Sequence, residues 1–284
     1  MVVRIVTDST SDIPPQLIKE LDILVVPVYV QIGEKFLRDG IDISHDEIYD
    51  KVREGSTKIT TSQPNPHDFA DVYQKLSQET NDIISIHLTS DLSGTYNSAL
   101  QGKDMINSPV NVEVVDSRTV SMGLGLITIA AARMAQKGKN MAEITEEVKS
   151  IAPNTNVFAM FDTLKYVLQG GRLGKASALL GNLLNVKPML TIKNGKLSPA
   201  GVSRTRKKGL DRLFDIVKNT KHPYEVGIVQ STTSDETITL KERLSSLVDK
   251  SHIYISRLGP ALGSHGGPGT LILAVRNKLP VPSR

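Results

Sequence analysis

Residues 83–117, IISIHLTSDLSGTYNSALQGKDMINSPVNVEVVDS, contain the pattern that decides the fold class. Residues 83–88 are a short apolar run rich in isoleucine, which is typical of a buried strand. Residues 93–105 have the pattern of a helix, and residues 110–115 are a second β-rich run, closed by Asp116-Ser117. A strand, a helix and a strand in this order predict two parallel strands joined by a helical crossover.

The same alternation of strands and helices continues on both sides of this unit. Two further β-rich runs precede it, at residues 2–6 and 23–30, and helices are expected at residues 65–78, 123–136 and 141–151. Polar residues or prolines stand before several of these helices, as is usual for N-caps and first helical turns. Strands that alternate with helices predict a parallel sheet with helices on both faces.

The second half of the chain shows a different pattern. Asn194-Gly195 separates the apolar runs 188–192 and 197–202, and this dipeptide is a strong signal of a β-hairpin. The hairpin supplies an antiparallel pair, so the sheet of this half should be mixed. The other elements are expected in the order strand, helix, strand, helix, strand, strand at residues 157–161, 205–218, 225–229, 234–248, 252–255 and 270–275.

Residues 152–156, Ala-Pro-Asn-Thr-Asn, are the best candidate for a linker between the two patterns. The sequence therefore predicts an α/β protein with two lobes. Residues 1–154 are expected to form an N-terminal lobe with a parallel sheet flanked by helices. Residues 155–284 are expected to form a C-terminal lobe with a mixed sheet and helices.

The composition is that of an ordinary globular chain. Its 284 residues are 39% hydrophobic and 23% charged, so a proper core can form. The chain has no cysteine, which excludes disulfides and thiolate chemistry and fits a reducing compartment. The N-terminus has no secretory pattern, and the longest uncharged stretch, between Arg118 and Arg133, is shorter than the ~20 residues of a membrane span. We therefore expect a soluble, cytoplasmic protein.

The charge of the chain says little about its partners. The formal net charge is only +4, with both signs interspersed. The concentrated basic run, residues 204–208, is interpreted as the solvated start of a helix. A nucleic-acid-binding protein usually gathers its basic residues into a patch or stripe. We therefore expect no nucleic-acid partner. The alternative interpretation of residues 204–208 is a binding site for a polyanion.

Two polar segments lie where parallel α/β sheets usually bind ligands, at strand ends and helix starts. Residues 60–64, Thr-Thr-Ser-Gln-Pro, precede a helix capped by Asn65, and residues 90–95, Ser-Asp-Leu-Ser-Gly-Thr, follow the strand at 83–88. Their hydroxyl groups and free backbone N–H groups suit a carboxylate or a phosphate. Plain helix capping explains the same residues, and the sequence leaves both interpretations open.

Another candidate is His265, in the glycine-rich segment 262–270, LGSHGGPGT, which is expected to form a loop between two strands. Glycines let a backbone approach a neighbour closely, so this histidine is either a ligand-binding residue or a structural one. Residues 170–175, GGRLGK, resemble a phosphate loop but lack two of its required residues. Two long apolar segments, 122–132 and 178–192, either belong to the core or line a tunnel for an apolar ligand.

Six short motifs occur in order along nearly the whole chain, from residue 7 to residue 270. They are Thr-Asp-Ser-Thr-Ser-Asp at 7–12, Thr-Ser-Gln-Pro at 61–64, Leu-Ser-Gly-Thr-Tyr-Asn-Ser-Ala at 92–99, Val-Asp-Ser at 115–117, Gly-Gly-Arg at 170–172 and His-Gly-Gly-Pro-Gly-Thr at 265–270. Each motif alone is weak, but the ordered set resembles the DegV family. That family includes the fatty-acid-binding subunits of bacterial fatty acid kinase.

The resemblance implies a specific site. In the family, two α/β lobes enclose an acyl chain in a tunnel between them. The carboxylate of a long-chain fatty acid such as palmitate is held by residues that match Thr61, Ser93 and His265. An arginine near the acyl head group matches Arg204, with Arg206 as the alternative.

The resemblance also implies how such a site is used. The protein would be a lipid carrier with no catalytic residue, cofactor or metal. It would present the carboxylate to a separate ATP-dependent fatty acid kinase, which forms the acyl phosphate, and transient membrane contact would accompany loading. At about 0.8 kcal/mol per buried CH₂, a sixteen-carbon tail would contribute on the order of 10 kcal/mol before ordering costs.

Two other classes of function stay open from the residues. Ser93 as nucleophile and His265 as base would make a serine hydrolase that acts on acyl esters or thioesters. The sequence offers no G-x-S-x-G elbow and no obvious acid to orient the histidine. The run at 204–208 would serve a nucleic-acid-binding regulator, whose binding would depend on salt.

Overall fold

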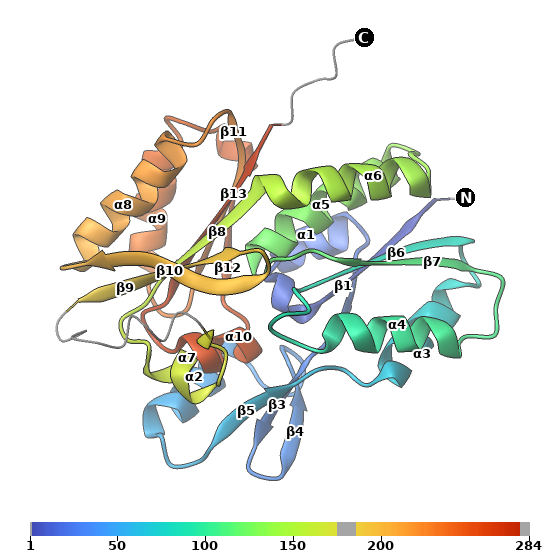
Figure 1. Cartoon of the computed structure of the whole chain (residues 1–284), viewed down its shortest axis with the longest axis horizontal. Coiled ribbons are helices and arrows are strands. Elements are labelled where there is room, and N and C mark those ends of the chain that lie inside the picture. Colours follow the sequence, from blue (N-terminus) through green and yellow to red (C-terminus); the bar gives the residue numbers. More distant parts are fainter. Residues whose placement is uncertain (1, 175–185, 279–284) are drawn as a thin grey trace.

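The computed structural model describes residues 2–174 and 186–278, and its strands form three sheets. The strands are β1 (Arg4–Asp8), β2 (Leu24–Val26), β3 (Tyr29–Ile32), β4 (Lys35–Arg38), β5 (Ile59–Ser62), β6 (Asp82–His87), β7 (Asn111–Asp116), β8 (Thr155–Met160), β9 (Lys187–Lys193), β10 (Lys196–Ser203), β11 (Pro223–Gln230), β12 (Ile253–Arg257) and β13 (Leu271–Asn277). The two larger sheets lie side by side, and the small sheet β4-β3-β5 lies below their junction (Figure 1).

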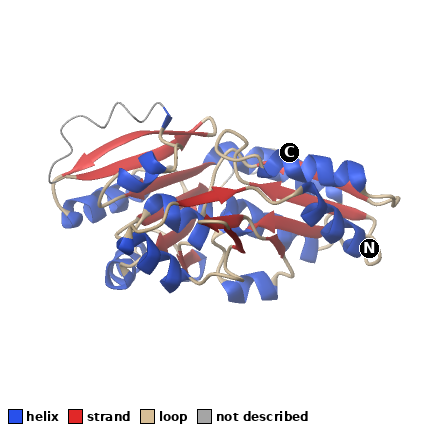
Figure 2. Ribbon diagram, turned by 90° about the horizontal axis from the view of Figure 1, so that it is seen from below, coloured by secondary structure: helices blue, strands red, loops and turns tan. Residues whose placement is uncertain are grey.

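Ten α-helices lie in the described residues and cover the sheets. They are α1 (Pro15–Glu20), α2 (His45–Glu54), α3 (Pro66–Leu76), α4 (Thr95–Met105), α5 (Met122–Gln136), α6 (Met141–Ile151), α7 (Lys165–Gln169), α8 (Arg206–Lys218), α9 (Ser234–Leu244) and α10 (Pro260–Gly266), with short 3₁₀ turns η1 (Ser9–Ser11), η2 (Ala152–Asn154) and η4 (Lys250–His252). Figure 2 shows these helices packed around the strands of both larger sheets. No helix in the described ranges is long and apolar enough to cross a membrane.

The first large sheet has the strand order β2-β1-β6-β7, and all of its neighbours are parallel. The predicted unit at 83–117 is confirmed: β6 and β7 pair side by side, and α4 makes the crossover between them. Helices α1, α5 and α6 pack on one face, and α3 and α4 pack on the other. The parallel sheet with helices on both faces is therefore confirmed.

The second large sheet is mixed, as predicted. Its strand order is β10-β9-β8-β13-β11-β12, and only β11 and β12 pair in parallel. Asn194 and Gly195 form the turn of the hairpin, with φ values of 51° and 82°. Two successive positive φ values give the tight turn whose twist matches that of the flanking strands. Helices α8 and α9 cover the outer face of this sheet.

Helix α5 lies between the two large sheets, and eleven of its fifteen residues are buried. This explains why residues 122–132 are apolar on every side: they are core, packed against β1 and against β8, β11 and β13. The core cluster around α5 contains Ile5, Ile127 and Ile272, and it therefore continues past residue 154. The division into lobes at that residue stays a prediction. The candidate linker itself forms η2 and the first residues of β8.

One predicted strand was wrong, and a whole sheet was not expected. Residues 23–30 were predicted as a single strand, but Pro27 and Val28 separate β2, in the parallel sheet, from β3, in the small antiparallel sheet. Proline has no N–H group to donate to a sheet, so the strand ends there. The small sheet is antiparallel throughout, and it is completed by β4 and β5.

A buried ionic cluster fastens α5 to the mixed sheet. Glu225 on β11 is fully buried. Its carboxylate accepts hydrogen bonds from Arg276 (Nε, 2.8 Å), Arg133 of α5 (Nη1, 2.7 Å) and the Tyr254 hydroxyl (3.1 Å). A buried carboxylate is tolerated only when its charge and lone pairs are satisfied in this way.

Glu225→Ala is expected to lower the free energy of unfolding by about 3–5 kcal/mol, because it leaves Arg276 buried without a partner. Urea denaturation would measure this. The matched control is Glu113→Ala, which removes the exposed ion pair with Lys149 and should change the free energy by about 0–1 kcal/mol. Equal changes in the two variants would contradict a buried, tightly coupled cluster.

Candidate functional site

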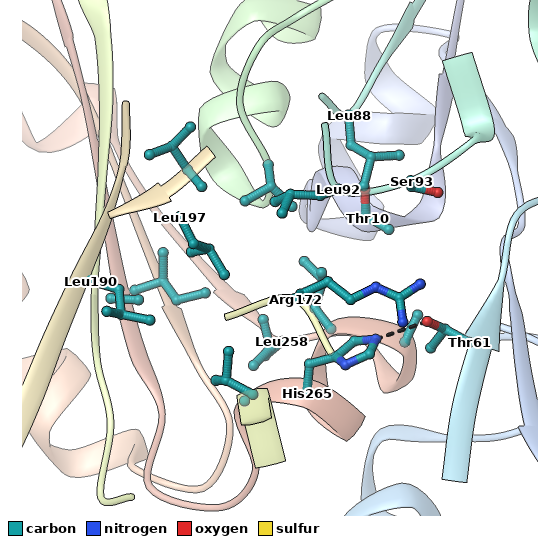
Figure 3. A pocket seen from close by; sticks show the side chains of 18 of the residues that line it. Thr10, Thr61, Leu88, Leu92, Ser93, Arg172, Leu190, Leu197, Leu258 and His265 are labelled. Atoms are coloured by element: carbon teal, nitrogen blue, oxygen red, sulfur yellow. Dashed lines mark hydrogen bonds between the residues drawn. The ribbon is translucent and has the colours of Figure 1, made fainter. Parts of the chain in front are cut away.

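A largely apolar cavity lies where the two large sheets, the small sheet and α10 meet (Figure 3). The space between its walls that no protein atom fills, counted together with adjoining space open to solvent, is about 970 Å³. Most of its wall is apolar, and residues from both halves of the chain contribute to it. The apolar lining consists of Val28, Leu88, Leu92, Val120, Val157, Ala159, Phe161, Val167, Leu190, Ile192, Leu197, Leu258, Ala261, Leu262 and Ile272.

Polar side chains gather at one part of this cavity. Thr61 on β5 and His265 on α10 are 204 residues apart in sequence, yet Thr61 Oγ1 lies 2.8 Å from His265 Nε2. Thr61 reaches this point because β5 pairs with β3, with Thr61 opposite Val30. His265 was expected in a glycine-rich loop, but it lies in the last turn of α10. That expectation was wrong because Pro260 starts a short helix there, as proline at a first helical position often does.

The surroundings of His265 keep its ring neutral. Burial of the ring and, to a lesser extent, the nearby positive charge of Arg172 together lower the pKa of the imidazole from 6.5 to about 4. Gly170 lies against the ring, since a Cβ atom at this position would be 2.0 Å from His265 Nδ1. Only glycine leaves room for the imidazole, which gives a physical reason for the first residue of the Gly-Gly-Arg motif.

Ser93 lines the same cavity but has a different partner. Its Oγ lies 2.9 Å from Thr95 Oγ1 and accepts a weaker hydrogen bond, at 3.3 Å, from the Thr95 backbone N–H at the start of α4. Both interpretations of this segment therefore apply, because the serine contacts the first turn of a helix and also faces the cavity. The structure thus brings Thr61, Ser93 and His265 to one cavity.

The cation at the polar part of the cavity is Arg172, which the sequence analysis did not single out. Its guanidinium lies beside Thr61 and His265 (Figure 3), and its Nη1 donates to the Gly170 carbonyl at 2.6 Å. Among the described lining residues it alone carries a permanent charge. The Gly-Gly-Arg motif at 170–172 is the feature of the sequence that could have predicted this arginine.

The structure places the two predicted arginines elsewhere. Arg204 is exposed and is not among the residues that line the cavity. Arg206 is held by Glu236, by Asp162 and by the carbonyl of Gly269. Since these carboxylates already neutralise Arg206, it is not available to a ligand in this arrangement.

The geometry gives little support to a hydrolase. Among the described residues, the side-chain hydrogen bond of His265 goes to Thr61, with none to Ser93. Gly170 faces Nδ1, the ring atom that an orienting acid would contact in a catalytic triad. The same described ranges contain no cluster of histidine and carboxylate side chains suited to a metal.

The other apolar segment, 178–192, is described only in part. Residues 175–185 lie outside the described residues, so the prediction that they line a tunnel is not examined by the structure. The remainder belongs to β9, where Leu190 and Ile192 face the cavity.

Comparison with known proteins assigns the chain to a family. The sequence model described as "Uncharacterised protein, DegV family" matches residues 2–278. A DegV domain-containing protein from Caldanaerobacter subterraneus subsp. tengcongensis is 37% identical over 269 residues, which cover 94% of this chain and 95% of that protein. The chain therefore belongs to the DegV family, and the resemblance seen in its motifs is confirmed.

Two solved structures carry the comparison further. A DegV family protein from Thermus thermophilus, whose structure is described as showing fatty acid binding, has a TM-score of 0.89 at 33% identity and covers 98% of this chain and 100% of its own. DegV from Bacillus subtilis, described as a fatty acid binding protein, has a TM-score of 0.87 at 28% identity, with the same coverage. The α/β fold with a parallel and a mixed sheet is thus the fold of relatives that bind fatty acids.

The lowered pKa of His265 makes a prediction about acid stability. In the unfolded chain the imidazole takes up a proton near pH 6.5, whereas in the folded protein it stays neutral down to about pH 4. The contribution of the neutral His265 ring to folding stability is therefore fully present above pH 6.5, and it is lost as the pH falls toward 4. The difference in unfolding free energy between lipid-free wild type and His265→Gln should shrink over this interval, as measured by urea denaturation. A difference that does not vary with pH would mean that the ring titrates as it does in water.

Proposed function

We propose that this protein binds one long-chain fatty acid, with the tail in the apolar part of the cavity and the carboxylate at its polar part. The observation that carries the proposal is that one cavity combines a mostly apolar wall with hydroxyl, imidazole and guanidinium groups. A detergent-like ligand, apolar along its length and ionised at one end, matches this distribution. The fatty acid binding described for the relatives from T. thermophilus and B. subtilis supports it.

The charges of the polar residues suit a carboxylate. Because His265 is neutral, the positive charge opposite a ligand carboxylate would come from Arg172. Thr61 and Ser93 would donate hydroxyl hydrogen bonds, which are stronger when the acceptor is ionised. Binding strength would come mainly from the tail, at about 0.8 kcal/mol per buried CH₂.

We further propose that the bound carboxylate is presented to a separate ATP-dependent fatty acid kinase, which converts it to an acyl phosphate. Thr61, Ser93, Arg172 and His265 are each partly exposed, so a partner enzyme could reach a head group held among them. The hydroxyl and cationic groups would also stabilise charge on the acyl phosphate as it forms. A carrier of this kind would work in the cytoplasm and would contact membranes only briefly, to load or release its ligand.

Fatty acid binding is tested by calorimetry on delipidated protein with palmitate as the probe. Thr61→Val and Arg172→Gln should each weaken binding by about 10- to 150-fold, because each removes a hydrogen bond to an ionised group. Arg204→Gln, a matched arginine substitution outside the lining, should leave the affinity unchanged.

The opposite pattern, with Arg204→Gln weakening binding and Arg172→Gln neutral, would return the head-group role to Arg204. Wild-type protein that contains no fatty acid after purification, and binds none when palmitate is added, would refute the proposal.

Presentation to a kinase makes a separate prediction. Loaded protein incubated with ATP and a bacterial fatty acid kinase catalytic protein should yield acyl phosphate, trapped by hydroxylamine as the acyl hydroxamate. Either protein alone should yield none. If the chain by itself hydrolyses a chromogenic acyl ester, and Ser93→Ala abolishes this turnover, then the protein is a hydrolase and not a carrier.

A further inference from the structure

Two buried carboxylates hold the first turn of α10, the helix that carries His265. Asp12 Oδ1 accepts a hydrogen bond from the Gly259 N–H at 2.9 Å, and Asp39 Oδ1 accepts one from the Ala261 N–H at 3.1 Å. The side chains of Asp12 and Asp39 come from the other half of the chain, and both residues are buried. They occupy the place where a short helix has free N–H groups and a positive dipole end.

The second oxygen of each carboxylate is also satisfied. Asp12 Oδ2 accepts a hydrogen bond from the Ser121 hydroxyl at 2.6 Å, and Asp39 Oδ2 accepts one from the Ser9 hydroxyl at 2.7 Å. Ser121 has φ 55° and ψ −145°, a backbone conformation that residues other than glycine rarely adopt. The backbone before α5 is therefore held in a strained form at the position where its hydroxyl contacts Asp12.

The ionised forms of these two carboxyl groups are costly to bury. Burial is the main cause that raises the pKa of Asp12 to about 8 and that of Asp39 to about 6, and negative charge nearby (Asp39 and Asp8 for Asp12, Asp8 for Asp39) contributes to these values. Among the described residues, neither group forms an ion pair with a lysine or an arginine, and the titratable groups whose charges act on them or are affected by them include Asp8 and Tyr49. A raised carboxyl pKa stabilises the fold at low pH, and this contribution is lost as the pH rises from about 4 to 8. The hydrogen bonds that these groups make to α10 and to two serines therefore come at a cost that grows with pH.

The position of Asp39 indicates the role of these buried groups. Thr61 lies on β5 of the small antiparallel sheet, and Asp39 directly follows β4 at the end of the same sheet. This sheet therefore contacts α10 at two points, at Ala261 through Asp39 and at His265 through Thr61. Ala261 and His265 are four residues apart, one above the other on the helix face that lines the cavity.

We propose that Asp39, assisted by Asp12, is a positioning residue that fixes α10 on the small sheet so that His265 meets Thr61 at the head-group site. The choice of a fatty acid as the ligand rests on the proposed function, whereas the contacts of Asp39 with α10 do not depend on it. Since α10 has only seven residues, a helix released at Ala261 would turn or shift as a unit. The imidazole would then leave the space above Gly170.

The test compares Asp39→Asn, which keeps an oxygen to accept from the Ala261 N–H, with Asp39→Leu, which has a similar size and no acceptor. Asp39→Ala is measured in parallel, so that a failure of the leucine variant to fold does not end the experiment. Two probes are used on the full chain. Palmitate reports the head-group site, and hexadecanol, which has the same tail without the charge, reports the apolar cavity.

Asp39→Leu and Asp39→Ala should lose at least about tenfold in palmitate affinity, with hexadecanol affinity nearly unchanged, and Asp39→Asn should retain most of the palmitate affinity. Equal losses for the two probes would show a merely structural role and overturn the inference. No loss of palmitate affinity in any variant would overturn it as well.

A second readout needs no ligand. In the lipid-free protein, NMR titration should show the pKa of the His265 ring moving up from about 4 toward 6.5 in Asp39→Ala but not in Asp39→Asn. An unchanged ring in both variants would refute the positioning role. Wild-type protein that binds no palmitate would refute the proposed function alone, because the ring titration would still decide whether Asp39 positions His265.

Discussion

The hydrogen bond between Thr61 and His265 can form only when distant parts of the chain are correctly assembled. It joins a strand of the small antiparallel sheet to a helix of the C-terminal half, and its imidazole occupies the space left by the missing side chain of Gly170. The polar part of the cavity is therefore a product of tertiary structure. The apolar wall also combines different elements, because strand residues such as Ala159 and Leu190 meet loop and helix residues such as Leu92 and Val167.

Buried polar groups mark the junctions of this fold. Asp8 at the end of β1 accepts from the backbone of Leu88 and lies 3.0 Å from His87 Nδ1 on the neighbouring strand, inside the parallel sheet. Glu225 joins α5 to the mixed sheet, and Asp39 joins the small sheet to α10. Such groups are costly to bury unless every partner is in place, so they favour one arrangement of the sheets over all others.

Local patterns predicted the large sheets well, because their strands and helices have strong periodic signals. The hairpin at Asn194-Gly195 and the helix at residues 141–151 lie where the sequence placed them. The small sheet was missed, since its strands are short and partly polar, and Pro27 breaks the apolar run that leads into it. The helix around His265 was missed because glycine and proline are poor helix formers, and contacts from distant residues hold it instead. The family resemblance predicted Arg204 at the head group. Only the three-dimensional packing around Gly170 shows that Arg172 reaches the cavity.

The place of β13 in the mixed sheet has a consequence for how the protein is made. This strand lies between β8 and β11, although it follows both of them in the chain. Until residues 271–277 are in place, β8 and β11 lack the strand that joins them, and their facing edges have no partner in the sheet. Strand edges of this kind are templates for pairing with other chains. A chain that ends before residue 271 would keep these edges open and would be prone to aggregate.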